Sequence, residues 1–501
     1  MSRRRCAASS GSGGASAPPA DFARLQERFF RRWGGRDPLE VDGGTLVVLP
    51  SLTFPPAELR KITGIEHYEE RLLYLVLQLA RPRRRVVYLT SRRLDPAIVD
   101  YHLSLLGDPG DARRRLDLLS LGASHPRGLT AGLLADDAAL ARLDGAIGDP
   151  GDAFALPFNV TPLERELAER ARLPLYGAHP DLAYLGSKSG SRKVARAAGV
   201  PVLDGSEDLR SVEDVAEALR RLADRRPHPA SAAVVKLNHG FSGQGNATIR
   251  LDRLTTPLTD TPTTFCAEEE GWGSYAPKMA AEGAVVEEWV RAPAASPSVQ
   301  VRLAPGGGVA VLSTHDQMLG DPLGQVYLGC RFPADPRYRA EIRSCARRVA
   351  AVLAGEGVIG HFAIDFLVAP TGSPPRVWLS EINLRVGGTT HPFGMARAVT
   401  GGVYEPDTGE LRVGGTAKAY VSTDNLTIES ASGGTTPQVM RLLDDEGLLF
   451  DARARTGATL HLLGAVSSYG KVGVTCIGDS PGHAEDIYRR AVAALGTAPG
   501  G

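Results

Sequence analysis

Strand-like and helix-like segments alternate through the first part of the chain, and this alternation restricts its fold more than any other feature. TLVVLPSL (45–52) and RVVYLTS (85–91) are short apolar runs typical of buried strands. EHYEERLLYLVLQLA (66–80) and DPAIVDYHLSLL (95–106) carry apolar residues at helical spacing instead. Because strands that alternate with helices form parallel sheets, we predict an α/β domain over residues 40–183.

The remainder of the chain is predicted to contain shorter elements in a different order. They are helices at 187–198, 211–224 and 336–355, strands at 230–237, 247–251 and 283–290, and hairpins that pair 298–303 with 309–314 and 360–368 with 376–383. The last segment reads as a helix, two strands and a helix, which indicates a small α+β unit. We predict five parts: a disordered tail (1–39), the α/β domain (40–183), two subdomains (184–290 and 291–429) separated by an Ala/Pro-rich hinge, and a C-terminal α+β domain (430–501).

Composition excludes several classes of protein. The chain has 501 residues, and its 57 basic and 57 acidic residues cancel, so no general attraction to nucleic acids or anionic membranes is expected. The five cysteines form no C-x-x-C pair and no metal spacing, which is typical of thiols in a reducing cytoplasm. The N-terminus lacks the apolar stretch of a secretory signal, and no apolar run is long enough for a transmembrane helix. We expect a cytoplasmic protein.

The hairpin formed by 360–368 and 376–383 carries the most informative polar residues. If its turn is centred near Ser373, Asp365 lies opposite Glu381, with Cβ atoms about 4.5–5.5 Å apart. Asn383 shares a face with Glu381 because strand side chains alternate. Two unpaired carboxylates this close repel each other, whereas a divalent cation such as Mg²⁺ would hold both. The bland alternative is that the acids face water on an edge strand, and a slip of one residue would separate them.

A glycine-rich turn follows the strand that ends at Lys236. Its small residues are Gly240, Ser242, Gly243 and Gly245. A lysine beside such a turn suits polyphosphate, since the ammonium supplies charge and glycines let backbone N–H groups approach oxygens. Neither the Walker spacing nor G-x-G-x-x-G occurs. The alternative is a tight hairpin with a solvated lysine.

Two further positions are candidate binding residues. Lys188 begins a helix, where its charge opposes the helix dipole, so either anion binding or surface solvation explains it. Glu287 and Glu288 precede Trp289 and Val290 at a strand end before the hinge. Such a segment can bind a flat base through its backbone, although a solvated acid at a strand end is the simpler interpretation.

The order of these motifs resembles that of the ATP-grasp ligases. More narrowly, KLNHGFSGQGN and EINLRVGGTTHP look like the pheganomycin-type peptide ligases of that superfamily, over roughly residues 40–501. The resemblance implies an ATP-grasp fold, multidomain with α/β and α+β parts, preceded by an α/β pre-grasp domain and followed by the small C-terminal domain. The subdomain at 184–290 would bind nucleotide, and that at 291–429 would bind metal.

The resemblance also implies a role for each matching residue. Lys188, Lys236 and the glycine-rich turn would hold the phosphates of ATP, and Glu287 with the backbone of Glu288 and Val290 would hold adenine. The remaining roles are Mg²⁺ ligation by Asp365, Glu381 and Asn383, acyl-phosphate or carboxylate contact by Arg385, and N–H donation to a tetrahedral intermediate by Gly387 and Gly388. Two positions depart from the family pattern: Ser187 stands for an aspartate, and Ala294 for the acid that contacts ribose.

The implied activity is ATP-dependent peptide ligation, in which a carboxylate becomes an acyl phosphate that an amine attacks. The partners are a small carboxylate, such as an amino acid, and an amine or peptide acceptor, in natural-product biosynthesis. The sequence leaves open a ligase for a dipeptide or other small amide, a non-catalytic nucleotide-binding protein, and a homodimer as one assembly. His391 could contact substrate, but a lone histidine is more often structural.

Overall fold

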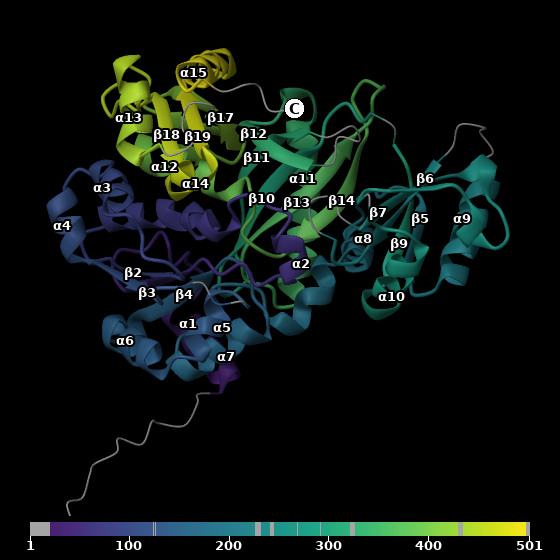
Figure 1. Cartoon of the computed structure of the whole chain (residues 1–501), viewed down its shortest axis with the longest axis horizontal. Coiled ribbons are helices and arrows are strands. Elements are labelled where there is room, and N and C mark those ends of the chain that lie inside the picture. Colours follow the sequence, from purple (N-terminus) through teal and green to yellow (C-terminus); the bar gives the residue numbers. More distant parts are fainter. Residues whose placement is uncertain are drawn as a thin grey trace, which may run out of the picture.

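The structure is a computed structural model that describes residues 21–123, 125, 127–225, 232–240, 245–267, 269–290, 292–320, 326–428 and 434–496. Within these ranges the strands form sheets of four, five and ten strands. Figure 1 shows the four-stranded sheet at lower left, the five-stranded sheet at right, and the ten-stranded sheet between and above them. None of the described helices combines the length and the apolar character needed to cross a bilayer.

The four-stranded sheet is parallel, in the order β3-β2-β1-β4, as the alternating segments predict. Successive residues of β1 enter opposite cores, Leu46 with η1 and α3, and Val47 with α5, α6 and α7. The strands are β1 (Thr45–Leu49), β2 (Arg85–Thr90), β3 (Leu116–Ser120) and β4 (Ala153–Pro157). The helices are α2 (Pro56–Leu59), η1 (Ile65–Ala80), α3 (Pro96–Ser104), α4 (Pro109–Arg114), α5 (Leu129–Leu134), α6 (Asp137–Ile147), η2 (Pro150–Asp152) and α7 (Pro162–Ala171), with η1 wound as a 3-10 helix.

The disordered tail predicted over 1–39 is wrong for its second half. Helix α1 (Phe22–Trp33) begins at an Asp21 N-cap and buries Phe22, Leu25, Phe29 and Trp33. These residues recur at helical spacing, and their rings pack on Phe154 of β4 and on neighbouring aromatics. The Gly/Ser/Ala content of the first 20 residues, which lie outside the described ranges, concealed this signal. The helix completes the core of the parallel sheet.

The five-stranded sheet is antiparallel, in the order β5-β9-β6-β7-β8. Apolar faces of α9 and α10 pack on it through residues such as Leu219 and Met279. Helix α8 belongs to another core, where Val194 packs with Leu379 and Ile382 of β14. The elements are η3 (Pro180–Gly186), α8 (Lys188–Ala197), β5 (Gly205–Leu209), α9 (Val212–Arg225), β6 (Ala232–Leu237), β7 (Asn246–Arg250), η4 (Leu251–Arg253), η5 (Leu258–Asp260), β8 (Thr263–Phe265), α10 (Trp272–Glu282) and β9 (Ala284–Glu288).

The ten-stranded sheet contains both predicted hairpins, β10 with β11 and β13 with β14. Its main path runs β14-β13-β10-β11-β12-β17-β16-β15. The long helix predicted at 336–355 is α11, which packs on this sheet through residues such as Ile342 and Val349. The elements are β10 (Pro297–Leu303), β11 (Val309–Gly320), β12 (Val326–Phe332), α11 (Pro336–Gly355), β13 (Gly360–Val368), β14 (Val377–Asn383), α12 (Thr390–Thr400), β15 (Val403–Glu405), β16 (Glu410–Val413) and β17 (Thr416–Thr427).

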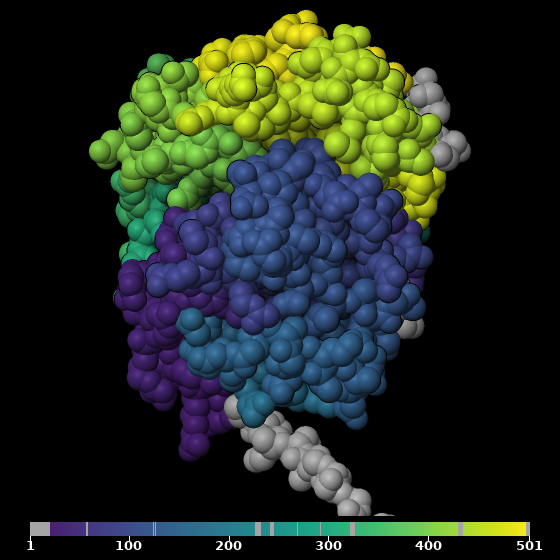
Figure 2. Space-filling view, turned by 90° about the vertical axis from the view of Figure 1, so that its left-hand side faces the viewer, coloured from purple at the N-terminus to yellow at the C-terminus, as the bar shows by residue number. Residues whose placement is uncertain are grey.

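The C-terminal segment has the predicted order of helix, two strands and helix, but it does not form a separate sheet. Strand β19 pairs with both β18 and β17, so it continues the large sheet. The elements are α13 (Thr436–Asp445), β18 (Gly457–His461), η6 (Leu463–Ala465), α14 (Val466–Tyr469), β19 (Lys471–Gly478) and α15 (Pro481–Ala494). Figure 2 shows this segment, in yellow, seated directly on the blue N-terminal region. The exact boundaries of the five predicted parts stay a prediction.

Candidate active site

A cavity of about 300 Å³ lies where the three sheets meet. Residues of β6, the β9 end, β13 and β14 line it, together with Leu52 and Phe158 from the loops that follow β1 and β4. The carboxyl ends of β1 and β4 form the switch point of the parallel sheet, where open α/β sheets bind ligands. The cavity therefore collects polar residues from all parts of the fold.

The acidic pair predicted from the hairpin is present. Asp365 of β13 lies opposite Glu381 of β14, and Ala363 lies opposite Asn383. A β-bulge shifts the register between Asp365 and Phe366. Asp365 pairs with Glu381, but Phe366 pairs with Leu379, so one residue of β14 is skipped. The extra residue of β14 at this bulge is what brings Glu381 opposite Asp365, as bulges near functional sites often re-aim side chains.

Asp365 forms one end of a chain of polar contacts. Asn383 Nδ2 donates to Asp365 Oδ2 at 3.0 Å, and Arg385 Nη2 donates to Asn383 Oδ1 at 3.1 Å. Burial raises the pKa of Asp365 to about 6, and the negative charge of Glu381 adds to this shift. The two carboxylates thus share one site, beside an amide whose oxygen is held by Arg385, and ionisation of both acids is disfavoured without a cation. These donors fit a divalent metal ion that prefers oxygen ligands.

Lys188 reaches this acidic pair from another element. Ser187 caps α8, with its Oγ accepting from the N–H of Gly190 at 3.0 Å, so the helix begins at Lys188. The ammonium Nζ lies 2.9 Å from Glu381 Oε1, and it donates to the carbonyl of Gly240 at 3.4 Å. Ser187, which replaces the aspartate of the family pattern, therefore supplies the helix cap that positions Lys188.

Lys236 belongs to a buried ion-pair network that the sequence did not reveal in full. Lys236 Nζ lies 2.6 Å from Glu287 Oε2, and Arg192 Nη1 lies 2.5 Å from Glu287 Oε1. Burial opposes the ionisation of Glu287, but Lys236 and Arg192 outweigh it and lower the pKa. Arg192 follows Lys188 by one helical turn on α8, and this i to i+4 spacing is the signal that could have identified it.

The end of β9 and the two residues after it line the cavity, through Glu288, Trp289 and Val290. The side chain of Glu287 does not, since it is buried beneath the wall in its two ion pairs. Of the glycine-rich turn, Gly240 lines the cavity, and Gly245 adopts a φ of 83° that favours glycine. Ser242 and Gly243 lie outside the described residues.

The two glycines after β14 differ in environment. The N–H of Gly387 donates to Thr390 Oγ1 at 3.0 Å, so it is already satisfied within the protein. The predicted donation from this N–H to a reacting oxygen would require it to leave Thr390, and it stays a prediction. Gly388 lines the cavity beside Tyr327, and a Cβ there would lie 2.7 Å from a ring carbon of that tyrosine.

His391 lies behind the cavity wall, in the predicted structural role. Its Nε2 is 3.3 Å from Asp424 Oδ1, and His461 Nε2 is 2.8 Å from the same oxygen. Burial lowers the pKa of His391 to about 3, so its ring is neutral at pH 7. Asp424 also pairs with Arg71 at 2.8 Å, and Arg71 does line the cavity. Neither Asp424 nor Arg71 was predicted from the sequence.

Comparisons with known proteins agree with this architecture. Residues 261–406 match the family described as IQCH-like, ATP-grasp, and residues 438–491 match the family described as PGM1 C-terminal domain. The chain is 34% identical over 469 residues to the L-propargylglycine–L-glutamate ligase of Streptantibioticus cattleyicolor, covering 91% of this chain and 95% of that enzyme. It is 21% identical to IQ motif-containing protein H of Danio rerio, covering 83% of this chain and 45% of that protein.

Solved structures share the fold at lower sequence identity. An ADP complex of N5-carboxyaminoimidazole ribonucleotide synthetase superposes with a TM-score of 0.52 at 15% identity, covering 90% of this chain and 97% of that chain. A biotin carboxylase from Campylobacter jejuni in complex with β-γ-ATP gives a TM-score of 0.55 at 14% identity, covering 89% of this chain and 90% of that chain. The fold prediction is confirmed.

Proposed function

This chain belongs to the ATP-grasp carboxylate–amine ligases, the family that includes L-propargylglycine–L-glutamate ligase, and we propose that it joins the carboxylate of an amino acid to the amine of an amino acid or peptide. ATP transfers its γ-phosphoryl group to a carboxylate oxygen, giving an acyl phosphate and ADP. The amine then attacks the acyl carbon, the C–O bond to phosphate breaks, and the amine loses a proton. The products are an amide and inorganic phosphate.

One observation carries the proposal. The Asp365–Glu381 pair from the large sheet and Lys188 from α8 meet in a cavity whose wall is the Glu288–Val290 segment. Phosphoryl transfer depends mainly on positioning and on neutralising the charge of the phosphates. A site with a divalent-metal donor set, a buried lysine and an adjoining backbone segment supports that requirement without a nucleophilic side chain.

We assign Mg²⁺ to Asp365, Glu381 and Asn383. When bound, Mg²⁺ would neutralise the negative charge of the nucleotide phosphates. The chain's own contribution is the bulge that brings Glu381 opposite Asp365. Lys188, which contacts Glu381, is assigned to the phosphates. Lys188 can exchange Glu381 for a phosphate on the glycine-rich turn, because its ammonium already reaches the carbonyl of Gly240 there.

We assign adenine to the backbone of Glu288 and Val290, and the β-phosphate side of the nucleotide to Lys236 with Gly240, Ser242, Gly243 and Gly245. The carboxylate of Glu287 is held by Arg192 and Lys236. We therefore assign Glu287 to positioning Lys236 rather than to contacting adenine. Ribose has no assigned acid, since Ala294 stands at the position where the family pattern has one.

We assign the acyl-phosphate end of the reaction to Arg385 and Gly388. Arg385 continues the face of Asn383 and lines the cavity, which supports contact with the anionic reacting group. The N–H of Gly388 is the remaining candidate for donation to developing oxyanion charge, since that of Gly387 is satisfied by Thr390. One such donor contributes on the order of 3 kcal/mol in other enzymes.

The test is amine-dependent turnover. Purified protein with ATP and Mg²⁺ is screened against amino-acid donors and acceptors, beginning with L-propargylglycine and L-glutamate because the relative is named for them. ADP release that requires both substrates, with an amide of the expected mass, is the predicted result. A single small amide, with no acceptance of peptides, would favour the narrower dipeptide or small-amide ligase. Nucleotide binding with no amine-dependent ADP release would favour a non-catalytic protein and overturn the proposal. A homodimer stays a prediction for light scattering.

A further inference from the structure

One wall of the cavity is basic and comes from η1 rather than from the strands that carry the acidic pair. Arg71 of η1 lines the cavity although only 8% of the residue is exposed. Its guanidinium lies over the ring of Tyr68, 5.1 Å from the centroid, and Tyr68 lines the same cavity. Its Nε is buried and has no hydrogen-bond partner among the described residues. A buried guanidinium N–H left unsatisfied at a cavity wall is costly, which points to a missing acceptor.

Behind this wall, a buried acid fixes the guanidinium. Arg71 Nη2 lies 2.8 Å from Asp424 Oδ2, on the opposite oxygen from the two histidines. Burial opposes ionisation of Asp424, but Arg71 and His391 outweigh it and hold the pKa well below its usual range. Asp424 is therefore ionised, and one edge of the guanidinium is permanently occupied. The Nε–H, on the same residue that lines the cavity, has no partner among the described residues.

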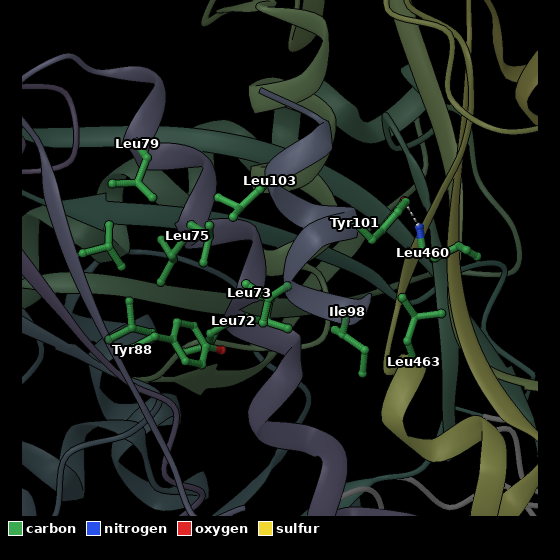
Figure 3. Close-up of a cluster of buried hydrophobic side chains, with 14 of the residues drawn as sticks. Leu72, Leu73, Leu75, Leu79, Tyr88, Ile98, Tyr101, Leu103, Leu460 and Leu463 are labelled. Atoms are coloured by element: carbon green, nitrogen blue, oxygen red, sulfur yellow. Dashed lines mark hydrogen bonds between the residues drawn. The ribbon is translucent and has the colours of Figure 1, made fainter. Parts of the chain in front are cut away.

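The helix that carries Arg71 is anchored between two parts of the fold. Leu72, Leu73 and Leu75 of η1 are buried in a core that continues to Leu460 and Leu463. Figure 3 shows these side chains converging, with the hydroxyl of Tyr101 hydrogen-bonded to the C-terminal strand. Its acceptance of the Leu460 N–H at 2.8 Å ties α3 to β18. Arg71 thus has little freedom to swing away, and it is preorganised for an anion.

A second buried cation lies close by. Lys471 Nζ donates to the hydroxyl of Tyr68 at 3.0 Å and to the carbonyl of Thr63 at 3.1 Å. Its ammonium also lies 5.1 Å from the centroid of the Tyr68 ring, on which Arg71 packs as well. Burial lowers the pKa of Lys471, as expected for an ammonium in a poorly solvated site. Tyr68 thus bridges two cations whose field favours an anion at this wall.

From this geometry we infer that Arg71 binds the free α-carboxylate of the acceptor amino acid or peptide. The inference rests on the proposed ligase function and names the substrate group that this wall recognises. The donor carboxylate is consumed in acyl-phosphate formation, so it lies beside Asp365, Glu381 and Arg385. The acceptor reacts through its amine and keeps its carboxylate throughout. A fixed guanidinium with an open N–H edge on the same cavity suits that permanent carboxylate.

The wild-type protein provides the first test. Each proteinogenic L-amino acid is offered as acceptor in its acid form and as its α-amide, with ADP release and product mass as readouts. Replacing a charged acceptor by a neutral one should raise the acceptor KM roughly 10- to 100-fold, with a smaller effect on kcat. Equal use of acid and amide acceptors would overturn the inference without any variant being made.

Variants locate the effect. Arg71→Lys keeps a charge for Asp424 but loses the second N–H edge, and Arg71→Met removes the charge. Both should lose most of the preference for the acid acceptor, whereas Arg60→Met, an exposed arginine outside the cavity wall, should keep it. Thermal unfolding shows which variants fold, because unpairing Asp424 is destabilising. If Arg71→Met does not fold, Arg71→Lys and the wild-type comparison decide the inference.

Hydroxylamine separates this inference from the proposed function. It replaces the acceptor amine but has no carboxylate, so it traps the acyl phosphate as a hydroxamate without using Arg71. The Arg71→Lys variant should lose far more amide coupling than hydroxamate formation. Equal loss of both would place Arg71 on the donor side and overturn the inference. No hydroxamate and no ADP from the wild-type protein would overturn the ligase function itself, and the inference with it.

Discussion

A methyl group added at Gly388 should impair turnover far more than one added at Gly387. A Cβ at Gly388 would lie 2.7 and 2.8 Å from two ring carbons of Tyr327, whereas the nearest atom to a Cβ at Gly387 is Arg385 Nη1 at 3.8 Å. Neither glycine is among those with positive φ, so alanine is compatible with the backbone at both positions. The two substitutions therefore form a matched pair that differs in steric overlap.

The overlap sets the expected magnitude. Carbon atoms pack at about 3.5–4.0 Å, so the Gly388→Ala methyl overlaps the Tyr327 ring by roughly 1 Å. Overpacking of this kind costs about 1–3 kcal/mol, through movement of either the ring or the strand end. If the Gly388 N–H is displaced from the reacting oxygen, kcat should fall by on the order of 10- to 100-fold. Gly387→Ala, with ordinary contact distances, should keep most of the activity.

The assay is amine-dependent ADP release, with hydroxamate formation as the acceptor-independent readout. Gly388→Ala should lower both, because its effect is on the acyl-phosphate end of the site. A double variant with Tyr327→Leu should recover part of the loss, since the shorter side chain removes the ring that the methyl group meets. Equal activity of the two alanine variants, or no rescue, would refute the assignment of Gly388.

The remaining predictions concern the metal site and the N-terminal helix. Glu381→Gln should lower turnover by more than the roughly 10- to 100-fold that loss of an outer-shell metal partner causes, while nucleotide binding persists. The exposed Glu217→Gln, the control, should leave turnover unchanged. Near-normal turnover of Glu381→Gln would contradict the metal assignment. Trp33→Ala should lower the free energy of unfolding by about 3–5 kcal/mol in urea titrations, because the residue is 1% exposed. The exposed Arg31→Ala should change it by less than about 0.5 kcal/mol. Equal effects of the two substitutions would show that α1 does not contribute to the core. The pKa of about 6 for Asp365 predicts an effect of pH on stability when EDTA removes metal ions. A carboxyl whose pKa is raised on folding favours the unfolded state as it ionises. The free energy of unfolding should therefore fall by on the order of 2 kcal/mol from pH 4 to 7, relative to that of Asp365→Asn. Mg²⁺ should flatten this difference, and identical pH curves for the two proteins would contradict the shared-charge description of the site.

Local patterns in the sequence predicted much of the fold. The strands at 45–52 and 85–91 form the parallel sheet, and the helix at 336–355 has the bounds of α11. Helix α1 was missed because its apolar stripe follows a stretch of Gly, Ser and Ala that dominates the composition of the N-terminus. The pairing of β19 with β17 was missed for another reason, since strand pairing between distant segments leaves no local periodicity.

The candidate site shows the same division between local and distant information. The opposition of Asp365 and Glu381 could be predicted from a single hairpin, although the bulge that produces it was not foreseen. The contact of Lys188 with Glu381, the pairing of Arg192 with Glu287, and the pairing of Arg71 with Asp424 each join segments far apart in the chain. No spacing rule relates such partners, so only the folded structure identifies them.

The most direct test of the central claim follows one oxygen atom. Donor amino acid labelled with ¹⁸O in its carboxylate is incubated with protein, ATP, Mg²⁺ and acceptor, and the released phosphate is analysed by mass spectrometry. Because the acyl phosphate breaks at the bond between the acyl carbon and oxygen, one ¹⁸O should appear in inorganic phosphate for each amide formed. Unlabelled phosphate, or ¹⁸O found in AMP instead, would contradict activation of the carboxylate as an acyl phosphate.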